Sequence, residues 1–334
     1  MSFLSDVFNK DFNMDQKKMN VNVISDNEIK IGWGAFRNDL KLTNIVIPKS
    51  VAEIGGEAFS GCSNLTSIEI PNSVTSIGRE AFDGCSSLTS IEIPNSITDL
   101  GHYSFRGCSS LINIIIPNSV TSIGRGAFEG CSSLTGIEIP NSITDLGRYS
   151  FCGCYNLVGV EIPDSIIEIG DGVFRGCAGL INIEIPDSIT KIGFGAMLNC
   201  SSLVHIEIPN SVKEIGICAF SGCSKLTIVK VPNSVVKIEK EAFYGCSNII
   251  NIEIPESVTE IGESVFGGCS GLRNLIIHEK NPDIMASRLR FSGLKADNIS
   301  LYVPVGTGYA YRHNDYFSNF KEVFATRRRP FENE

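Results

Sequence analysis

The chain has 334 residues, of which 43% are hydrophobic, and its formal net charge at pH 7 is −9. This acidic balance argues against nucleic acid or an anionic membrane surface as the main partner. No apolar run approaches the roughly 18 residues that a membrane span requires, so we expect no membrane insertion.

The N-terminal region, residues 1–47, is predicted to cap one end of the molecule. Residues 1–20 are polar and lack the apolar segment of a secretory signal. From residue 25 the sequence follows a degenerate copy of the repeat described below, and this copy contains the only tryptophan, Trp33. Terminal copies of a repeat are expected to be atypical and polar on their outer face.

Residues 48–277 consist of ten copies of a 23-residue unit, and this period predicts a solenoid in which each copy forms one coil. A single coil buries too little apolar surface to offset its loss of backbone entropy, so neighbouring coils must share a core. A proline and a cysteine recur once in every unit. The prolines are Pro48, Pro71, Pro94, Pro117, Pro140, Pro163, Pro186, Pro209, Pro232 and Pro255. The cysteines are Cys62, Cys85, Cys108, Cys131, Cys154, Cys177, Cys200, Cys223, Cys246 and Cys269.

Residues 71–93 show the local structure that we expect of each coil. The unit ends in strict alternation, with isoleucines directed inward and Ser90 and Glu92 outward, which predicts a short half-buried strand. Pro94 closes this strand because proline lacks a backbone donor. Since every coil turns the same way, the strands of successive coils must be parallel.

The middle of the unit is predicted to form the bend and the far side of the coil. The hydroxyl of Ser73, like its equivalents in other units, is expected to bond a backbone group at the bend. A second short extended piece follows and ends at Gly78. Residues 79–83 are predicted to form one turn of α- or 3₁₀-helix, with Gly84 ending it in a left-handed conformation.

Two side-chain columns are predicted to fill the core. The ladder cysteines are expected to be buried free thiols, because stacked side chains point in parallel rather than toward each other. Cys152 and Cys218 lie off this ladder and are expected to be more exposed. The second column contains Phe59, Phe82, Phe105, Phe128, Phe151, Phe174, Met197, Phe220, Phe243 and Phe266.

Residues 278–334 depart from the repeat and are predicted to form a C-terminal cap. This region is rich in tyrosine and phenylalanine, which we expect to fold over the last coil. Residues 301–304 still read as a strand that a proline closes.

The repeat unit LxxIxIPxSVxxIGxxAFxGCxx, seen in residues 88–110 with variant residues at Leu100 and Ser104, resembles the BspA-like class of leucine-rich repeats. The resemblance covers about residues 25–277, and the tail from Leu301 is similar to the closing segment of many members. It implies a right-handed solenoid with a parallel β-sheet on the concave face and short strands and 3₁₀ or helical turns on the convex side. The asparagine ladder of the more familiar leucine-rich pattern is missing, since Ser96 is followed directly by Ile97.

Family resemblance also implies binding rather than catalysis, with a protein or glycoprotein ligand such as host matrix or another cell. Members of the class are often bacterial or protist surface proteins, so the leading hypothesis is an adhesin-like protein that is on the cell surface or secreted. The alternative is an intracellular, cytoplasmic scaffold for protein–protein interaction, which the polar N-terminus and the free thiols favour.

The outward positions of the sheet supply the candidate binding residues. A glutamate recurs at the second outward position of the strand, and a run of carboxylates there is interpreted either as a docking face for a basic partner or as a solvated face. Toward the C-terminal third, His205 and Lys230 make this face chemically different from the rest of the sheet. The candidate residues are Glu69, Glu92, Glu138, Glu161, Glu184, Glu207, Glu253, His205 and Lys230.

Catalytic and metal-binding motifs are missing from the sequence. A flat ladder of single carboxylates offers fewer oxygens than Ca²⁺ requires, and Cys152 with Cys154 makes no zinc motif. The sequence has no GxSxG elbow, no P-loop and no HExxH motif, and its four histidines are scattered. We therefore expect no enzyme activity, no metal and no cofactor.

Overall fold

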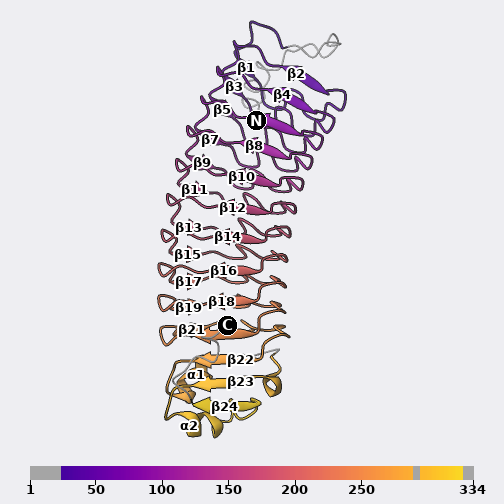
Figure 1. Ribbon diagram of the computed structural model, residues 1–334. Coiled ribbons are helices and arrows are strands. Elements are labelled where there is room, and N and C mark those ends of the chain that lie inside the picture. Colours follow the sequence, from indigo (N-terminus) through magenta and orange to yellow (C-terminus); the bar gives the residue numbers. More distant parts are fainter. Residues whose placement is uncertain (1–23, 289–293, 326–334) are drawn as a thin grey trace, which may run out of the picture.

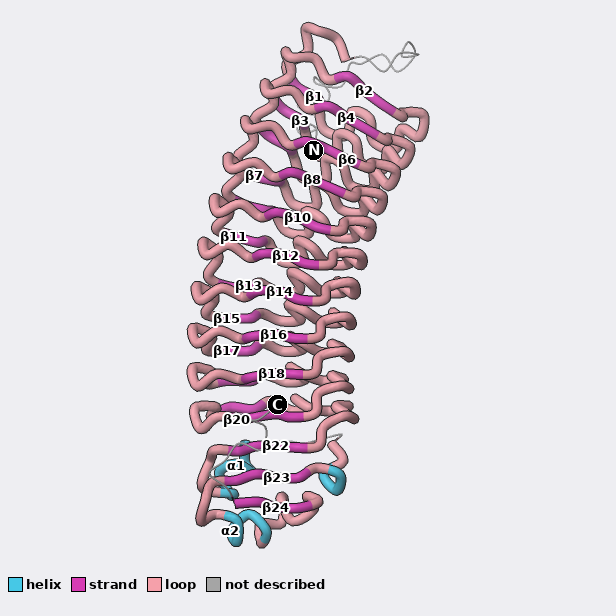
Figure 2. The backbone as a smooth tube through the Cα atoms, viewed as in Figure 1, coloured by secondary structure: helices cyan, strands magenta, loops and turns pink. Residues whose placement is uncertain are grey.

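The computed structural model describes residues 24–288 and 294–325, which form one elongated stack of coils (Figure 1). Through residue 277, each coil contributes one strand to each of two parallel arrays, and beyond it only one of the arrays continues (Figure 2). The expectation of a parallel-sheet solenoid built from the 23-residue unit is therefore confirmed. In the described ranges, helix is confined to short segments near the C-terminal end.

The array with the longer strands, here called the wide sheet, contains the alternating segment that the sequence predicted. Facing residues lie one unit apart, as in the pairing of Ile137 with Val160. Hydrogen-bonded pairing divides the array into a seven-stranded part and a six-stranded part, between β14 and β16. Its strands are β2 (Asn44–Val46), β4 (Ser67–Glu69), β6 (Ser90–Glu92), β8 (Asn113–Ile115), β10 (Gly136–Glu138), β12 (Gly159–Glu161), β14 (Asn182–Glu184), β16 (His205–Glu207), β18 (Ile228–Lys230), β20 (Asn251–Ile254), β22 (Asn274–Ile277), β23 (Ser300–Val303) and β24 (Glu322–Ala325).

The second array, here called the narrow sheet, is the short extended piece expected after the bend. Its strands contain two residues each, and in each the second residue faces the core. They are β1 (Lys30–Ile31), β3 (Glu53–Ile54), β5 (Ser76–Ile77), β7 (Asp99–Leu100), β9 (Ser122–Ile123), β11 (Asp145–Leu146), β13 (Glu168–Ile169), β15 (Lys191–Ile192), β17 (Glu214–Ile215), β19 (Lys237–Ile238) and β21 (Glu260–Ile261).

The predicted helical turn at residues 79–83 is wrong in its hydrogen bonding, because the segment forms successive β-turns instead. The amide of Ala81 donates to the carbonyl of Gly78 at 3.3 Å, but the amide of Glu80 donates to the next coil. A helix would keep both bonds within one coil. Because backbone amides here donate alternately within their own coil and to the next one, hydrogen bonds link the coils on this side as well. Gly84 has a φ of 70°, so its predicted left-handed conformation is confirmed.

Between the arrays lies a continuous apolar core that contains both predicted columns. The Phe128 ring is fully buried and stacks between Phe105 and Phe151, with ring centroids 5.6 and 5.4 Å apart. The ladder cysteines are buried and free, whereas Cys152 and Cys218 are half-buried, as predicted.

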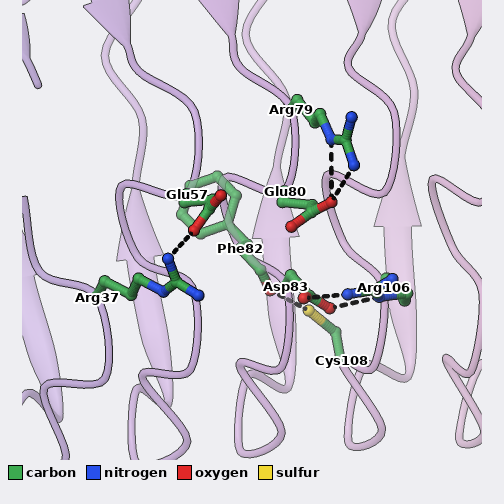
Figure 3. Close-up of polar contacts among 8 residues, drawn as sticks. All are labelled: Arg37, Glu57, Arg79, Glu80, Phe82, Asp83, Arg106 and Cys108. Carbon is green, nitrogen blue, oxygen red and sulfur yellow. Dashed lines mark hydrogen bonds and ion pairs between the residues drawn. The ribbon is translucent and has the colours of Figure 1, made fainter. Parts of the chain in front are cut away.

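Each ladder thiol also has a polar contact. The Sγ of Cys108 lies 3.2 Å from the carbonyl oxygen of Phe82, which belongs to the preceding coil (Figure 3). The thiols therefore bridge successive coils as well as fill space.

A glycine column marks the place where the backbones of successive coils approach most closely. A Cβ atom added to Gly124 would lie 2.6 Å from the carbonyl oxygen of Leu100 and 2.7 Å from the backbone nitrogen of His102. Real Cβ atoms do not come so close to backbone, so this position requires glycine for space rather than for its dihedral angles.

The serine at the bend makes the expected backbone bond in part of the coils. The hydroxyls of Ser50 and Ser142 donate to carbonyl oxygens of the preceding coil at 2.7 and 2.6 Å. The hydroxyl oxygen of Ser73 is buried without a partner among the described residues. The bond thus contributes to the turn without defining it.

At the N-terminal end, the degenerate copy is a true coil. Its strands β1 and β2 pair in parallel with β3 and β4, the strands of the first full repeat. Residues 1–23 lie outside the described residues, so their part in the predicted N-terminal cap remains a prediction.

At the C-terminal end the wide sheet continues beyond residue 277, because β23 and β24 extend the parallel ladder of β22. The predicted strand near residues 301–304 is therefore confirmed. The short helices α1 (Pro282–Arg288), η1 (Ala296–Asn298) and α2 (Gly308–Arg312) lie between these strands. Within the described ranges no helix is long and apolar enough to cross a membrane.

The predicted aromatic packing of this region is observed. Tyr311 and Phe317 are fully buried, with ring centroids 4.9 Å apart. The Tyr311 hydroxyl donates to the carbonyl oxygen of Glu279 at 2.7 Å. This bond ties the segment to the chain that leaves β22.

Candidate binding surface

The seven candidate glutamates all lie on the outward face of the wide sheet, at equivalent positions of seven strands. We call them the acidic column. Six of them are exposed, while Glu253 is half-buried. The sequence placed these side chains correctly because alternation along a strand fixes the face that each residue occupies. The acidic column contains Glu69, Glu92, Glu138, Glu161, Glu184, Glu207 and Glu253.

Within the acidic column, like charges face each other across neighbouring strands. Glu161 pairs in register with Glu138 on one side and with Glu184 on the other. Parallel strands are separated by about 4.8 Å, and like charges at this separation destabilise a sheet. Among the described residues, no ion pair involves any of the six glutamates from Glu69 to Glu207.

From β13 to β21 the narrow sheet avoids like-charge pairs by alternating the sign of its charges. Lys191 faces Glu168 on one side and Glu214 on the other, and its Nζ lies 3.4 Å from a Glu214 carboxylate oxygen. Lys30 and Glu53 form a similar pair at 2.9 Å. This protein therefore pairs opposite charges along much of the narrow sheet, where Asp99 and Asp145 face a serine instead, and leaves most outward charges of the wide sheet without an opposite charge.

The remaining candidate residues lie at the C-terminal part of the acidic column. Lys230 is exposed and occupies the register position between Glu207 and Glu253. His205 is exposed and faces Ile228. Glu253 contacts His278, with the Nε2 atom 2.7 Å from a carboxylate oxygen. The stretch of the column that faces no positive charge is therefore the one from Glu69 to Glu184.

The N-terminal half of the acidic column borders a hollow along the edge where each strand reaches its proline. A cavity of about 1100 Å³ extends from Glu69 to Ile115, and two smaller ones of about 460 and 570 Å³ follow toward Glu161. Glutamate side chains form one border of this hollow, and the turn after the proline forms the other.

Sequence reasoning missed the asparagines that line this hollow. They are exposed and offer both a donor and an acceptor beside the carboxylates. The signal was present in the sequence, since the residue after the proline is asparagine in six of the ten units: Asn72, Asn95, Asn118, Asn141, Asn210 and Asn233. The first four of these line the hollow.

On the side of the β-turns, arginines are mostly paired within the protein. Arg106 forms two bonds to Asp83, at 2.9 and 2.6 Å, and Arg79 contacts Glu80 at 2.9 Å (Figure 3). The hydrogen bonds to Asp83 raise the pKa of Arg106 above its ordinary value. This side therefore has less uncompensated charge to offer a partner than the acidic column has.

No group of three or more His, Cys, Asp or Glu side chains that would suit a metal ion occurs in the described part of the chain. Single carboxylates repeated along a sheet fit extended contact with a partner better than they fit the coordination of one ion.

The parallel arrays, the 23-residue coils and the buried columns define a leucine-rich-repeat solenoid. The family model for the BspA type leucine rich repeat region matches residues 29–158, 121–211, 144–273 and 196–305. These matches together cover most of the sequence, and the chain belongs to this family. The resemblance noted from the repeat unit is thereby confirmed.

Two solved structures illustrate the relationship. A leucine rich cell surface protein from Faecalibacterium prausnitzii shares 29% identity with this chain, and the match covers 79% of this chain and 86% of that one with a TM-score of 0.53. The pneumococcal vaccine antigen PcpA shares 19% identity over 86% of this chain and 80% of that one, with a TM-score of 0.51. The second likeness concerns the fold alone. A comparison with curated proteins finds no match.

Proposed function

We propose that this protein is a non-catalytic binding protein whose wide sheet recognises a protein or glycoprotein partner, in an adhesin-like role at a cell surface. The repeat family is generally non-enzymatic. The similar protein from F. prausnitzii is described as a cell surface protein, which supports the location. Host matrix or another cell would supply the partner.

The uncompensated acidic column is the observation that carries this proposal. Three neighbouring glutamates in register destabilise the sheet, whereas the narrow sheet from β13 to β21 alternates the sign of its charges. A partner with basic groups would supply the missing charges. Complementary charge of this kind speeds association and favours the correct partner.

The free cysteines support a second candidate function, an intracellular scaffold of the same fold. The two proposals share the binding surface and differ in the compartment. Cell fractionation separates them, because an intact chain found only in the cytosol excludes adhesion and one found at the surface excludes the scaffold.

Neutralising the centre of the acidic column tests the binding surface. The triple variant Glu138→Gln, Glu161→Gln, Glu184→Gln should capture at least tenfold less partner from an extracellular matrix extract, as measured by quantitative mass spectrometry. Its free energy of unfolding should be unchanged or higher by about 0.2–1 kcal/mol for each relieved pair.

The matched control is Asp99→Asn, Asp145→Asn, Glu168→Gln, which changes the net charge equally but on the narrow sheet. We expect this control to capture as much partner as the wild type does. Equal capture by the wild type and the wide-sheet variant would show that the acidic column is only a solvated face.

A further inference from the structure

Three columns of side chains lie next to one another on the wide sheet between β10 and β16, and together they form what we call the trough. One border is the stretch of the acidic column from Glu138 to Glu207. The floor begins with Gly136 and Gly159, the first residues of β10 and β12. The other border consists of Val158, Ile181 and Val204.

The apolar border of the trough is exposed although its residues are large. Val158, Ile181 and Val204 have 48%, 49% and 41% of their surface accessible. Backbone bonds of 3.0 and 3.1 Å join the three residues from coil to coil, so their side chains are held in one row. The chain has threonine at this position in five other coils, so the core does not need an apolar side chain there.

The floor of the trough is open over β10 and β12, where two glycines lack side chains. Asn182 and His205 continue the floor over β14 and β16. A Cβ atom added to Gly136 would meet nothing within 4 Å, and one added to Gly159 would meet only the Asn182 side chain, at 3.7 Å. These glycines differ from Gly124, which the packing requires. Glycine within a strand is destabilising relative to alanine, so the open floor is not explained by stability.

The dimensions of the trough fit an α-helix that lies along the solenoid. Val158 and Glu161 are three residues apart, so the two borders are separated by about 10 Å, close to the 10–12 Å diameter of a helix. One helical turn rises about 5.4 Å, and one coil rises about 4.8 Å. Over the three steps from β10 to β16 the mismatch is only about 2 Å, which a lysine side chain can span.

An extended strand fits the trough less well. Its outward residues recur every 6.6–6.8 Å, so the mismatch with the coils reaches about 6 Å over the same three steps. The two borders also differ in chemistry, and a helix can present an apolar face and a basic face at the same time.

We propose that the trough binds one amphipathic α-helix of a partner protein, with aliphatic side chains against the apolar border and lysine or arginine against the acidic column. This inference rests on the proposed binding role of the wide sheet and names the kind of partner. Helices that lay an apolar face into a groove are a common mode of peptide recognition.

A synthetic peptide tests the inference directly. The probe is an 18-residue fluorescein-labelled peptide of leucine and lysine (about five helical turns), with the leucines spaced to form one helical face, and binding is measured by fluorescence anisotropy at low salt. The variant Val158→Thr, Ile181→Thr, Val204→Thr should bind it at least tenfold more weakly than the wild type does. Threonine is native at this position in other coils, so the variant should fold normally. The floor variant Gly136→Asn, Gly159→Asn should weaken binding similarly.

Two controls keep the result specific. Ile112→Thr with Ile250→Thr removes exposed aliphatic residues from the same position outside the trough and should leave the affinity unchanged. A scrambled peptide of identical composition, without an apolar face, should bind at least tenfold more weakly than the probe does.

Equal affinity of the scrambled peptide and the probe, or equal affinity of the threonine variant and the wild type, would overturn the inference. The proposed function fails by a different measurement. If the glutamine variant loses capture from matrix extract while the threonine variant does not, the acidic column binds a partner but the trough does not hold a helix.

Discussion

Raising the pH from 8 to 10 is expected to destabilise the folded chain steeply, because the ladder thiols ionise readily only after unfolding. Burial raises the pKa of Cys62 from its ordinary 9.0 to about 11 and that of Cys131 to about 12, and it raises those of the other ladder cysteines as well. In the unfolded chain each thiol ionises near its ordinary value. The stabilisation is therefore complete below pH 9 and is lost as the pH rises from 9 toward the folded pKa values.

The expected size of this effect follows from proton linkage. At pH 10 each thiol favours unfolding by about 1.4 kcal/mol, and ten together by roughly 14 kcal/mol. Whole domains are stable by about 5–15 kcal/mol, so the loss is large enough to unfold the chain. Urea unfolding at pH 8 and pH 10, with reductant present, measures it.

A variant with fewer ladder thiols is the control for the alkaline effect. Cys131→Ala with Cys154→Ala should be less stable at pH 8, but it should lose about 3 kcal/mol less than the wild type between pH 8 and pH 10. Urea midpoints for the wild type that do not change with pH over this range would contradict the burial of the ladder.

Truncating one ring of the phenylalanine column should produce the largest effect of any single substitution considered for this chain. Phe128→Ala removes a fully buried ring from between two stacked neighbours, and we expect a loss of about 3–5 kcal/mol in the free energy of unfolding. Denaturant unfolding followed by circular dichroism measures this loss.

The chain itself offers the matched control, because Met197 occupies the same column in another coil and is fully buried. Phe128→Met should therefore lose less than half as much stability as Phe128→Ala. If Phe128→Ala lowered the free energy of unfolding by less than about 1 kcal/mol, the column would not be a packed core.

Sequence periodicity predicted the coils, both strand positions and the buried columns, because a repeated unit must place equivalent residues in equivalent environments. It did not predict the β-turns at residues 79–83. Local propensity is compatible with a helical turn there, but the amide of Glu80 bonds a carbonyl of the next coil. That hydrogen bond depends on how whole coils stack, so the sequence of a single unit does not predict it.

The candidate surface was also predicted only in part. Alternation along the strand placed Glu138 and Glu161 on the outer face of the wide sheet. The trough was missed because its features depend on what neighbouring coils carry at one position. Gly124 and Gly136 look alike in sequence, yet the first is packed against backbone and the second faces open space.

Cysteine accessibility along the intact chain tests the stacked core most directly. Alkylation with N-ethylmaleimide under native conditions, followed by peptide mass spectrometry, reports on each coil from Cys62 to Cys269 separately. We expect Cys152 and Cys218 to be modified and the ten ladder cysteines to be protected together. Modification of ladder cysteines in the middle coils, at rates similar to those of Cys152 and Cys218, would contradict a single continuous core.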